Sequence, residues 1–223
     1  IAVLFPGESS YTLDLTGLTT GLPSGAAKGA ISAQGDTGGA WSTFWSRVRE
    51  GFHHILPEGL DHILFVLGLF LLCRAWKPTL IQVTTFTAAH TVTLALATLG
   101  YVSAPADIVE PIIAASIAVI ALENIFRPTY GKFRILLVFV FGLIHGLGFA
   151  QRLIDERIPS GSIVSSLIGF NLGVEFGQLA VIALAVAATF WIKDEEKYRG
   201  WIVIPASTLI AVAGLFWAYQ RIA

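Results

Sequence analysis

The chain contains no methionine, one cysteine and few charged residues. Charged residues make up only 13% of the sequence and hydrophobic residues 55%, a balance that excludes an ordinary soluble domain. The lone Cys73 excludes an internal disulfide. Because methionine is absent, translation cannot begin at Ile1, and we expect a mature, processed or truncated chain. The net charge of -1 gives no basis for a nucleic-acid partner.

The apolar residues are gathered in runs long enough to cross a ~30 Å hydrocarbon core as helices. Backbone groups in lipid must be paired within their own segment, and these runs are too long for the strands of a barrel. We therefore predict an all-α integral membrane protein with a bundle of about six transmembrane helices. The predicted spans are residues 58–76, 79–100, 107–126, 133–153, 162–192 and 200–220.

Two regions precede the predicted membrane domain of residues 57–223. Residues 1–40 are rich in glycine, serine and threonine, and we expect an extracytoplasmic segment at the end of a larger region. Residues 41–56 show aromatic and aliphatic side chains at helical spacing, which predicts an amphipathic helix at the membrane interface. Eight lysines and arginines fall on one side of the membrane and six on the other, so the positive-inside rule places both termini outside.

The densest polar signal is the segment HHILPEGLDH at residues 53–62. Four of its residues have the spacing of one face of a continuous helix: His54, Glu58, Asp61 and His62. Polar side chains at this depth normally face the interior of a bundle. The segment is interpreted either as part of a metal site or as a polar network that orients the helix at the outer rim.

Two further histidines, His90 and His145, fall at comparable depth in later spans. One buried histidine is usually a satisfied core residue, but several together have the ligand chemistry of a transition-metal site. Three glycines next to His145 allow close helix contact: Gly142, Gly146 and Gly148. We predict that four residues form one cluster: Asp61, His62, His90 and His145.

Other polar residues also lie inside the predicted spans. They are Glu110, Glu123, Asn124, Asn171, Glu175 and Gln178, and the last three share a helical face. We expect no lysine or arginine within the hydrocarbon region to neutralise the carboxylates, which favours a metal cation or a proton as the missing charge.

With these residues in view, the chain resembles the HupE/UreJ family of membrane proteins, in the branch with an extracytoplasmic N-terminal domain. The matching segments are GLDHILFVLGLFLL (59–72), FTAAHTVTLALATLG (86–100), VEPIIAASIAVIALEN (109–124), FGLIHGLGFA (141–150) and FNLGVEFGQL (170–179). The resemblance implies a multi-pass protein of the bacterial inner membrane that takes up nickel or cobalt. It also implies that Asp61 and His62 contact the metal.

The leading hypothesis is a permease or channel for a divalent transition metal, with nickel or cobalt first and zinc or copper as further candidates. Ions would pass His53, His54 and Glu58, reach the cluster and continue toward Glu123 and Asn124. The complete set of predicted metal-handling residues is Asp61, His62, His90, His145, His54, Glu58, Glu110 and Glu175. The expected partners are the lipid bilayer, the metal ion and other membrane subunits.

Three alternatives to a permease stay open at this point. The first is an accessory or structural subunit of a larger membrane complex. The second is an intramembrane metal-dependent hydrolase, because a His/Asp cluster can also activate a metal-bound water. The third is a b-type haem carrier that uses His90 and His145 as axial ligands.

Overall fold

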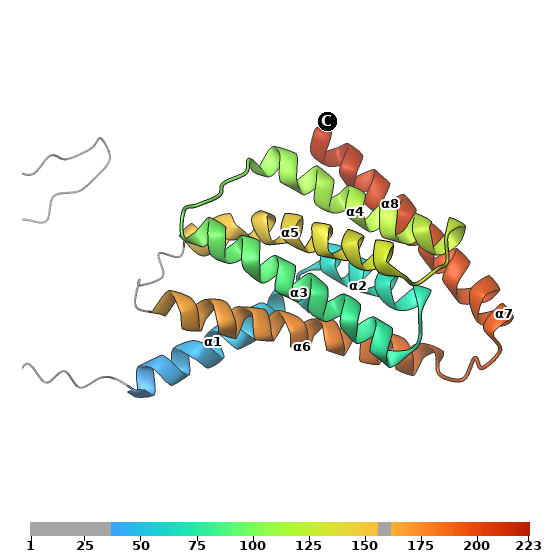
Figure 1. Ribbon diagram of the computed structural model, residues 1–223, viewed down its shortest axis with the longest axis horizontal. Coiled ribbons are helices and arrows are strands. Elements are labelled where there is room, and N and C mark those ends of the chain that lie inside the picture. The colour runs from blue at the N-terminus through green and yellow to red at the C-terminus, as the bar shows by residue number, and fades with distance from the viewer. Residues whose placement is uncertain (1–36, 156–161) are drawn as a thin grey trace, which may run out of the picture. The chain divides into compact units, whose positions relative to one another are not determined.

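The computed structural model describes residues 37–155 and 162–223, which are drawn in colour in Figure 1. By internal contacts the chain divides into Ile1–Gly35 and Asp36–Ala223, and every described residue belongs to the second unit. The extracytoplasmic segment predicted at residues 1–40 therefore lies outside the described residues, apart from 37–40.

The described residues form helices joined by short connections. The elements are α1 (Thr37–Ile55), α2 (Leu60–Leu72), α3 (Trp76–Thr98), α4 (Ala106–Phe126), α5 (Lys132–Asp155), α6 (Ile163–Thr189), α7 (Glu195–Tyr198), the π-helix η2 (Arg199–Val203) and α8 (Ile204–Ile222). No strand occurs in residues 37–155 or 162–223. The all-α fold class is confirmed.

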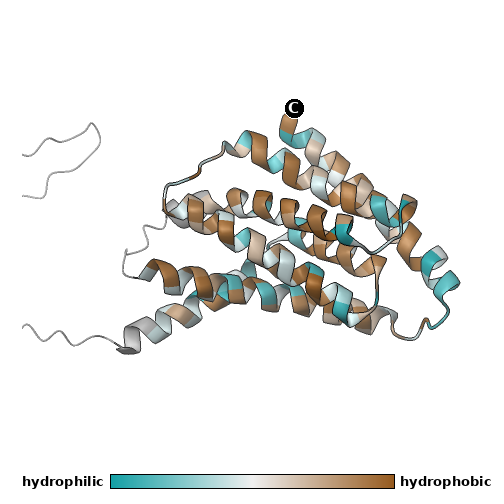
Figure 2. Cartoon of the chain, viewed as in Figure 1, coloured by the Kyte–Doolittle hydropathy of each residue, from teal (hydrophilic) through white to brown (hydrophobic). Residues whose placement is uncertain are grey.

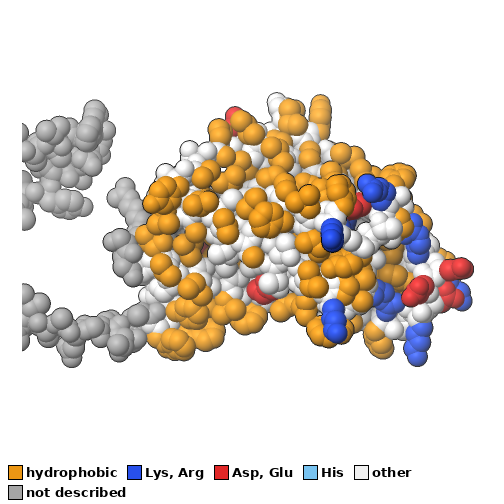
Figure 3. All heavy atoms as spheres, in the orientation of Figure 1, with side chains coloured by type: hydrophobic (Ala, Val, Ile, Leu, Met, Phe, Trp, Pro, Cys, Tyr) orange, Lys and Arg blue, Asp and Glu red, His pale blue; other side chains and the backbone are white. Residues whose placement is uncertain are grey.

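Five of the described helical segments are long and apolar enough to cross a membrane, and α1 with α2 supplies a sixth if the bent pair is one span. The prediction of about six transmembrane helices is thereby confirmed. Figure 2 shows apolar residues along the lengths of these helices, and Figure 3 shows charged side chains gathered toward the end that carries α7. This division is typical of a helix bundle with a lipid-facing surface.

The first predicted span differs most from the structure. Instead of a continuous helix over 58–76, α1 ends at Ile55 and α2 begins at Leu60, with a bend of 73° between the two axes. With 13 residues, α2 is about 20 Å long and too short to cross alone. The prediction that His54 and His62 share a face of one continuous helix is therefore wrong.

The break at residues 56–59 has a clear origin in the sequence. Pro57 lacks a backbone N–H and cannot continue the helix. The Gly59 N–H donates to the Ile55 carbonyl at 3.2 Å, which folds the turn back onto α1. A Cβ at Gly59 would lie only 2.1 Å from the His54 carbonyl oxygen, so this tight turn needs glycine. Two separate helices, of 19 and 13 residues, therefore meet inside the bundle.

α1 packs lengthwise against α6, and the two helices run in the same direction (Figure 1). A Cβ at Gly51 would lie 1.9 Å from the Phe170 carbonyl oxygen, and a Cβ at Gly173 equally close to that of Val48. The absence of side chains lets the two backbones touch. The interfacial position of residues 41–56 stays a prediction, but the packing places the end of α1 beside the middle of α6, at Gly177.

α3 and α5 approach each other through glycines in the same way. A Cβ at Gly142 would lie 2.6 Å from the Phe86 carbonyl oxygen, and a Cβ at Gly146 would lie 2.4 Å from that of His90. On another face of α5, Gly148 packs against Ile113 of α4. These contacts confirm the close helix approach predicted from the glycines around His145.

We expect Gly173→Ala to lower the melting temperature of the purified protein. The new methyl group would collide with a backbone carbonyl rather than a movable side chain, at a cost of about 1–3 kcal/mol. Gly200→Ala is the matched control, because a Cβ at that position meets nothing within 4 Å. Thermal melting followed by size-exclusion chromatography in detergent compares the two variants. Equal melting temperatures would contradict the α1–α6 packing.

Candidate metal centre

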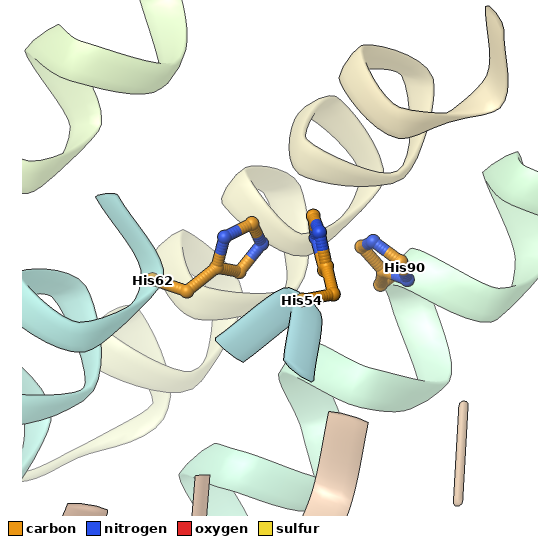
Figure 4. A group of neighbouring side chains, drawn as sticks. All are labelled: His54, His62 and His90. Atoms are coloured by element: carbon orange, nitrogen blue, oxygen red, sulfur yellow. The ribbon is translucent and has the colours of Figure 1, made fainter. Parts of the chain in front are cut away.

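Four histidines from four helices meet inside the bundle. His54 lies at the end of α1, His62 in the first turn of α2, His90 in α3 and His145 in α5. The ring centroid of His62 lies 4.7 Å from that of His54, 5.0 Å from that of His145 and 6.2 Å from that of His90. Figure 4 shows the rings of His54, His62 and His90 converging from three helices. The break between α1 and α2, rather than a shared helical face, brings His54 to His62.

His54, His62 and His90 have the geometry of a candidate metal site. One ring nitrogen from each lies within 4.8 Å of the others. A metal bonded to imidazole at about 2.0–2.1 Å needs its nitrogens about 3–3.5 Å apart. Small ring rotations would close that difference, so the three side chains fit a divalent transition metal in number, type and position.

Asn171 of α6 fixes the tautomer of His90. The side-chain amide of Asn171 donates to the Leu167 carbonyl at 2.8 Å, which leaves its Oδ1 to accept from His90 Nδ1–H at 3.1 Å. The other ring nitrogen of His90, Nε2, then carries a lone pair. This atom is buried and has no hydrogen-bond partner among the described residues. A buried, unpaired acceptor of this kind is costly unless a cation or a proton occupies it.

A hydrogen-bond chain orients His62 in a similar way. The Ser116 hydroxyl donates to the Ile113 carbonyl at 2.6 Å, so it accepts from His145 Nε2–H at 3.0 Å. His145 Nδ1 is then an acceptor and faces His62 Nε2 at 3.4 Å. This order leaves the Nδ1 lone pair of His62 for a cation. His145 thus contacts the cluster by supporting His62, and it is not one of the three converging nitrogens.

Aromatic side chains enclose the cluster. The His54 ring centroid lies 4.2 Å from that of Phe149, and the His145 ring centroid lies 5.1 Å from those of Phe65 and Phe86. Such a surrounding has a low dielectric constant, which strengthens the interaction of a bound cation with its ligands. A porphyrin between His90 and His145 would have to displace these rings, so the packing does not favour the haem alternative.

A cavity of about 460 Å³ leads to the histidines. It is lined by residues of α2, α4, α5 and α8 as well as the end of α1, and among them are His54, Glu58, Asp61, His62, Glu110, His145 and Arg221. We call it the histidine cavity. Glu58 and Glu110 are exposed, so carboxylates lie at its rim and imidazoles at its base. The shape allows a small hydrated cation to approach the cluster.

Asp61 has an arginine partner. Its Oδ2 accepts from Arg221 at 2.8 Å, and the same guanidinium donates to the backbone carbonyl of Glu110 at 3.0 Å. The expectation that no arginine neutralises the intramembrane carboxylates is wrong here, because Arg221, just beyond the predicted span 200–220, reaches Asp61 from the last turn of α8. The structure places Asp61 in the histidine cavity, while its direct contact with metal stays a prediction.

Glu123 also has an arginine partner, so the expectation of carboxylates without an arginine is wrong here too. The reason is the direction in which the Arg134 side chain extends. Arg134 lies in the first turn of α5, and its side chain is fully buried and paired with Glu123. A charged residue near a helix end is expected to extend toward water. Arg134 instead turns into the bundle, where it also donates to Asn124 Oδ1 at 3.2 Å. Glu123 and Asn124 are therefore engaged with Arg134.

The three polar residues of α6 all contact α3, as their shared face predicts. Thr84 donates to Glu175 at 2.8 Å and Thr87 donates to Gln178 at 3.2 Å, while Asn171 contacts His90. Glu175 is not among the three converging ligands, and its predicted part in metal handling stays a prediction. The supporting roles of Asn171 and Ser116 were not predicted, because only the fold shows which polar residue touches which histidine.

The fold and the histidine cluster define a polytopic α-helical membrane protein with a candidate metal site at a broken helix. Residues 31–221 match the protein family described as HupE / UreJ protein, and the chain belongs to the HupE/UreJ family. This family is associated with nickel and cobalt transport rather than with an enzymatic activity. No curated protein matches the chain, and no solved structure does so either.

The hydrogen bonds predict the tautomers of the buried histidines. In protein labelled with ¹⁵N at its five histidines, we expect the Nδ1–H form for His90 and the Nε2–H form for His145. Asn171→Leu should abolish the preference of His90 and leave that of His145 unchanged. Imidazole ¹⁵N chemical shifts measure both, with the exposed His53 as the internal reference. An Nε2–H form of His90 in the unaltered protein would contradict the assignment.

Proposed function

We propose that this protein carries a divalent transition-metal ion across the membrane, with nickel or cobalt as the first candidates. His54, His62 and His90 bind the ion inside the bundle. The observation that carries the proposal is the convergence of three imidazole nitrogens, one from each histidine, within 4.8 Å. His90 Nε2 is in addition buried and has no hydrogen-bond partner among the described residues. Membership of a family associated with nickel and cobalt transport supports the same function.

The chemistry of the ligands narrows the choice of metal. Neutral imidazole suits nickel, cobalt, zinc and copper(II), whereas copper(I) prefers sulfur ligands. The chain has no methionine, and its one cysteine, Cys73, lines a different cavity. Zinc and copper(II) are therefore the further candidates.

The carboxylates of the histidine cavity attract the ion before it reaches the imidazoles. Glu58 and Glu110 are exposed at the rim, where their negative field raises the local concentration of cations. Asp61 lies deeper and is paired with Arg221, so a divalent cation competes with the guanidinium for this carboxylate. Release of the ion restores the ion pair, which keeps metal contact at Asp61 reversible.

The break between α1 and α2 supports transport rather than permanent metal storage. His54 and His62 lie on opposite sides of the turn that links α1 to α2, so a change at residues 56–59 alters the distance between two ligands. Broken helices at the binding site are a recurring feature of membrane transporters. The carbonyl end of α1 also points its partial negative charge toward the site.

Metal binding and metal flux test this function directly. We expect the full chain in detergent to bind about one nickel or cobalt ion, and liposomes containing it to take up the metal. His62→Ala and His90→Ala should each abolish binding and uptake. His53→Ala is the matched control, since His53 is exposed on α1 next to His54 and, contrary to the predicted entry route, is not among the residues that line the histidine cavity. Equilibrium dialysis with elemental analysis measures binding, and a metal-sensitive dye inside the liposomes measures uptake.

Two results of this experiment would overturn the proposal. Absence of bound metal after loading would favour the accessory-subunit alternative. Binding without uptake would leave a structural or catalytic metal site, and a hydrolase assay would then be the next test.

The support from Asn171 predicts a graded effect on affinity. Asn171→Ala should weaken metal binding about 10–100-fold, because His90 loses the partner that orients its ring. Asn171→Asp should retain binding, since a carboxylate still accepts from His90 Nδ1–H. Gln178→Ala is the control on the same face of α6, where the side chain contacts Thr87 instead of a histidine. Equal affinities in the Asn171→Ala and Gln178→Ala variants would contradict this role.

A further inference from the structure

A second cavity lies at the opposite end of the bundle from the histidine cavity. Its volume is about 450 Å³, and its lining includes Cys73, Arg74, Asn124, Tyr198 and Arg199. We call it the arginine vestibule. The proposed permease requires a route from the histidines to another aqueous compartment, and the vestibule lies along the same helices as the histidine cavity.

Arg134 and its partners form a polar layer, which we call the Arg134 network. The guanidinium donates to Gln82 at 3.0 Å, to the carbonyls of Ile120 and Gly68 at 3.3 and 3.2 Å, and to Asn124 at 3.2 Å. It also forms an ion pair with Glu123. Every N–H group of the guanidinium thus has a hydrogen-bond partner. This one side chain of α5 therefore links α2, α3 and α4.

The Arg134 network lies between the two cavities. The order of residues along α2 shows this, and so does the order along η2 and α8. On α2, His62 lines the histidine cavity, Gly68 contacts Arg134, and Leu71 lines the vestibule. Trp217 of α8 lines the histidine cavity, and Val203, at the end of η2 directly before α8, lines the vestibule. Between them, Ser207 accepts from Asn124 of the network at 3.3 Å.

An apolar layer separates the histidines from the Arg134 network. Phe65 of α2, Phe86 of α3 and Ile117 of α4 are each at most 1% exposed and belong to one core cluster. On α3, for example, Phe86 lies between His90 above it and Gln82 below it, about one helical turn from each. A cation that leaves the histidines would meet first this apolar layer and then a guanidinium removed from water.

We propose, on the basis of the permease function above, that the Arg134 network is the barrier of the transport route. The arginine vestibule is then the opening of that route to the second aqueous compartment. The positive charge of Arg134 repels a divalent cation, and Glu123 holds the guanidinium across the route. Passage requires the guanidinium to leave its position between α2 and α4. The structure is accordingly a state in which the histidine site is open to one side alone.

Thiol labelling of the full chain in vesicles tests the barrier. The native Cys73 reports on the vestibule, and Ile117→Cys in a Cys73→Ser chain reports on the apolar layer behind the Arg134 network. A positively charged, membrane-impermeant methanethiosulfonate reagent is added from each side in turn. We expect Cys73 to react from one side only and Ile117→Cys to be unreactive from that side.

Weakening the Arg134 network should let the reagent pass from the arginine vestibule to the apolar layer. Glu123→Gln removes the countercharge of Arg134, and Arg134→Gln/Glu123→Gln removes both charges and shortens the side chain that links the helices. In both backgrounds we expect the labelling rate of Ile117→Cys from the vestibule side to rise at least tenfold. The double variant is included because an unpaired buried charge can prevent folding. Arg127→Gln, at an exposed arginine of the same end, is the matched control.

Two outcomes separate the barrier from the permease function. An unchanged labelling rate of Ile117→Cys in the folded double variant would overturn the barrier, provided that Cys73 reacts normally in the double variant that retains this native cysteine. A wild-type chain that binds no nickel overturns the permease whatever the labelling shows, because labelling requires no metal. Increased labelling only in the barrier variants, with nickel stoichiometry unchanged, is the result that supports the inference.

Discussion

The structure depends on one constraint, which is that a polar group removed from water must find a partner within the bundle. Most buried polar side chains of the described residues find such a partner on a neighbouring helix. Asn171 holds His90, Ser116 holds His145, and Arg134 is satisfied by groups from α2, α3 and α4. His90 Nε2 has no such partner among the described residues, and the His90 ring lies beside those of His54 and His62. This buried and unpaired acceptor beside two other imidazoles is what supports the proposed metal site.

The same constraint arranges the bundle in layers along its axis. The histidines form one layer, Phe65, Phe86 and Ile117 form the next, and the Arg134 network forms the third. Electrostatic interactions are strong in an environment of low dielectric constant, so imidazoles favour a cation in the first layer while a guanidinium opposes it in the third. The proposed transport route therefore has its binding layer at one depth and its barrier at another.

Glycines make the polar layers possible. Gly146 lets α5 approach the backbone of His90, and Gly51 and Gly173 let α1 lie against α6. These contacts set the positions of His145 and His54 relative to α2. Because lipid provides no hydrophobic force between helices, close backbone packing is the main source of their association. Precise ligand placement in this protein therefore depends on residues that have no side chain.

The sequence by itself determined the helical membrane class, the approximate spans, the polar residues inside them and the family. These follow from composition, from the length of apolar runs and from local spacing. Tertiary structure alone decided the break that brings His54 to His62, the pairing of Asp61 with Arg221, and the inward turn of Arg134. The physical reason is that helical spacing relates residues on one continuous axis only. A bend at residues 56–59 or a long side chain that reaches another helix creates neighbours that no local pattern contains.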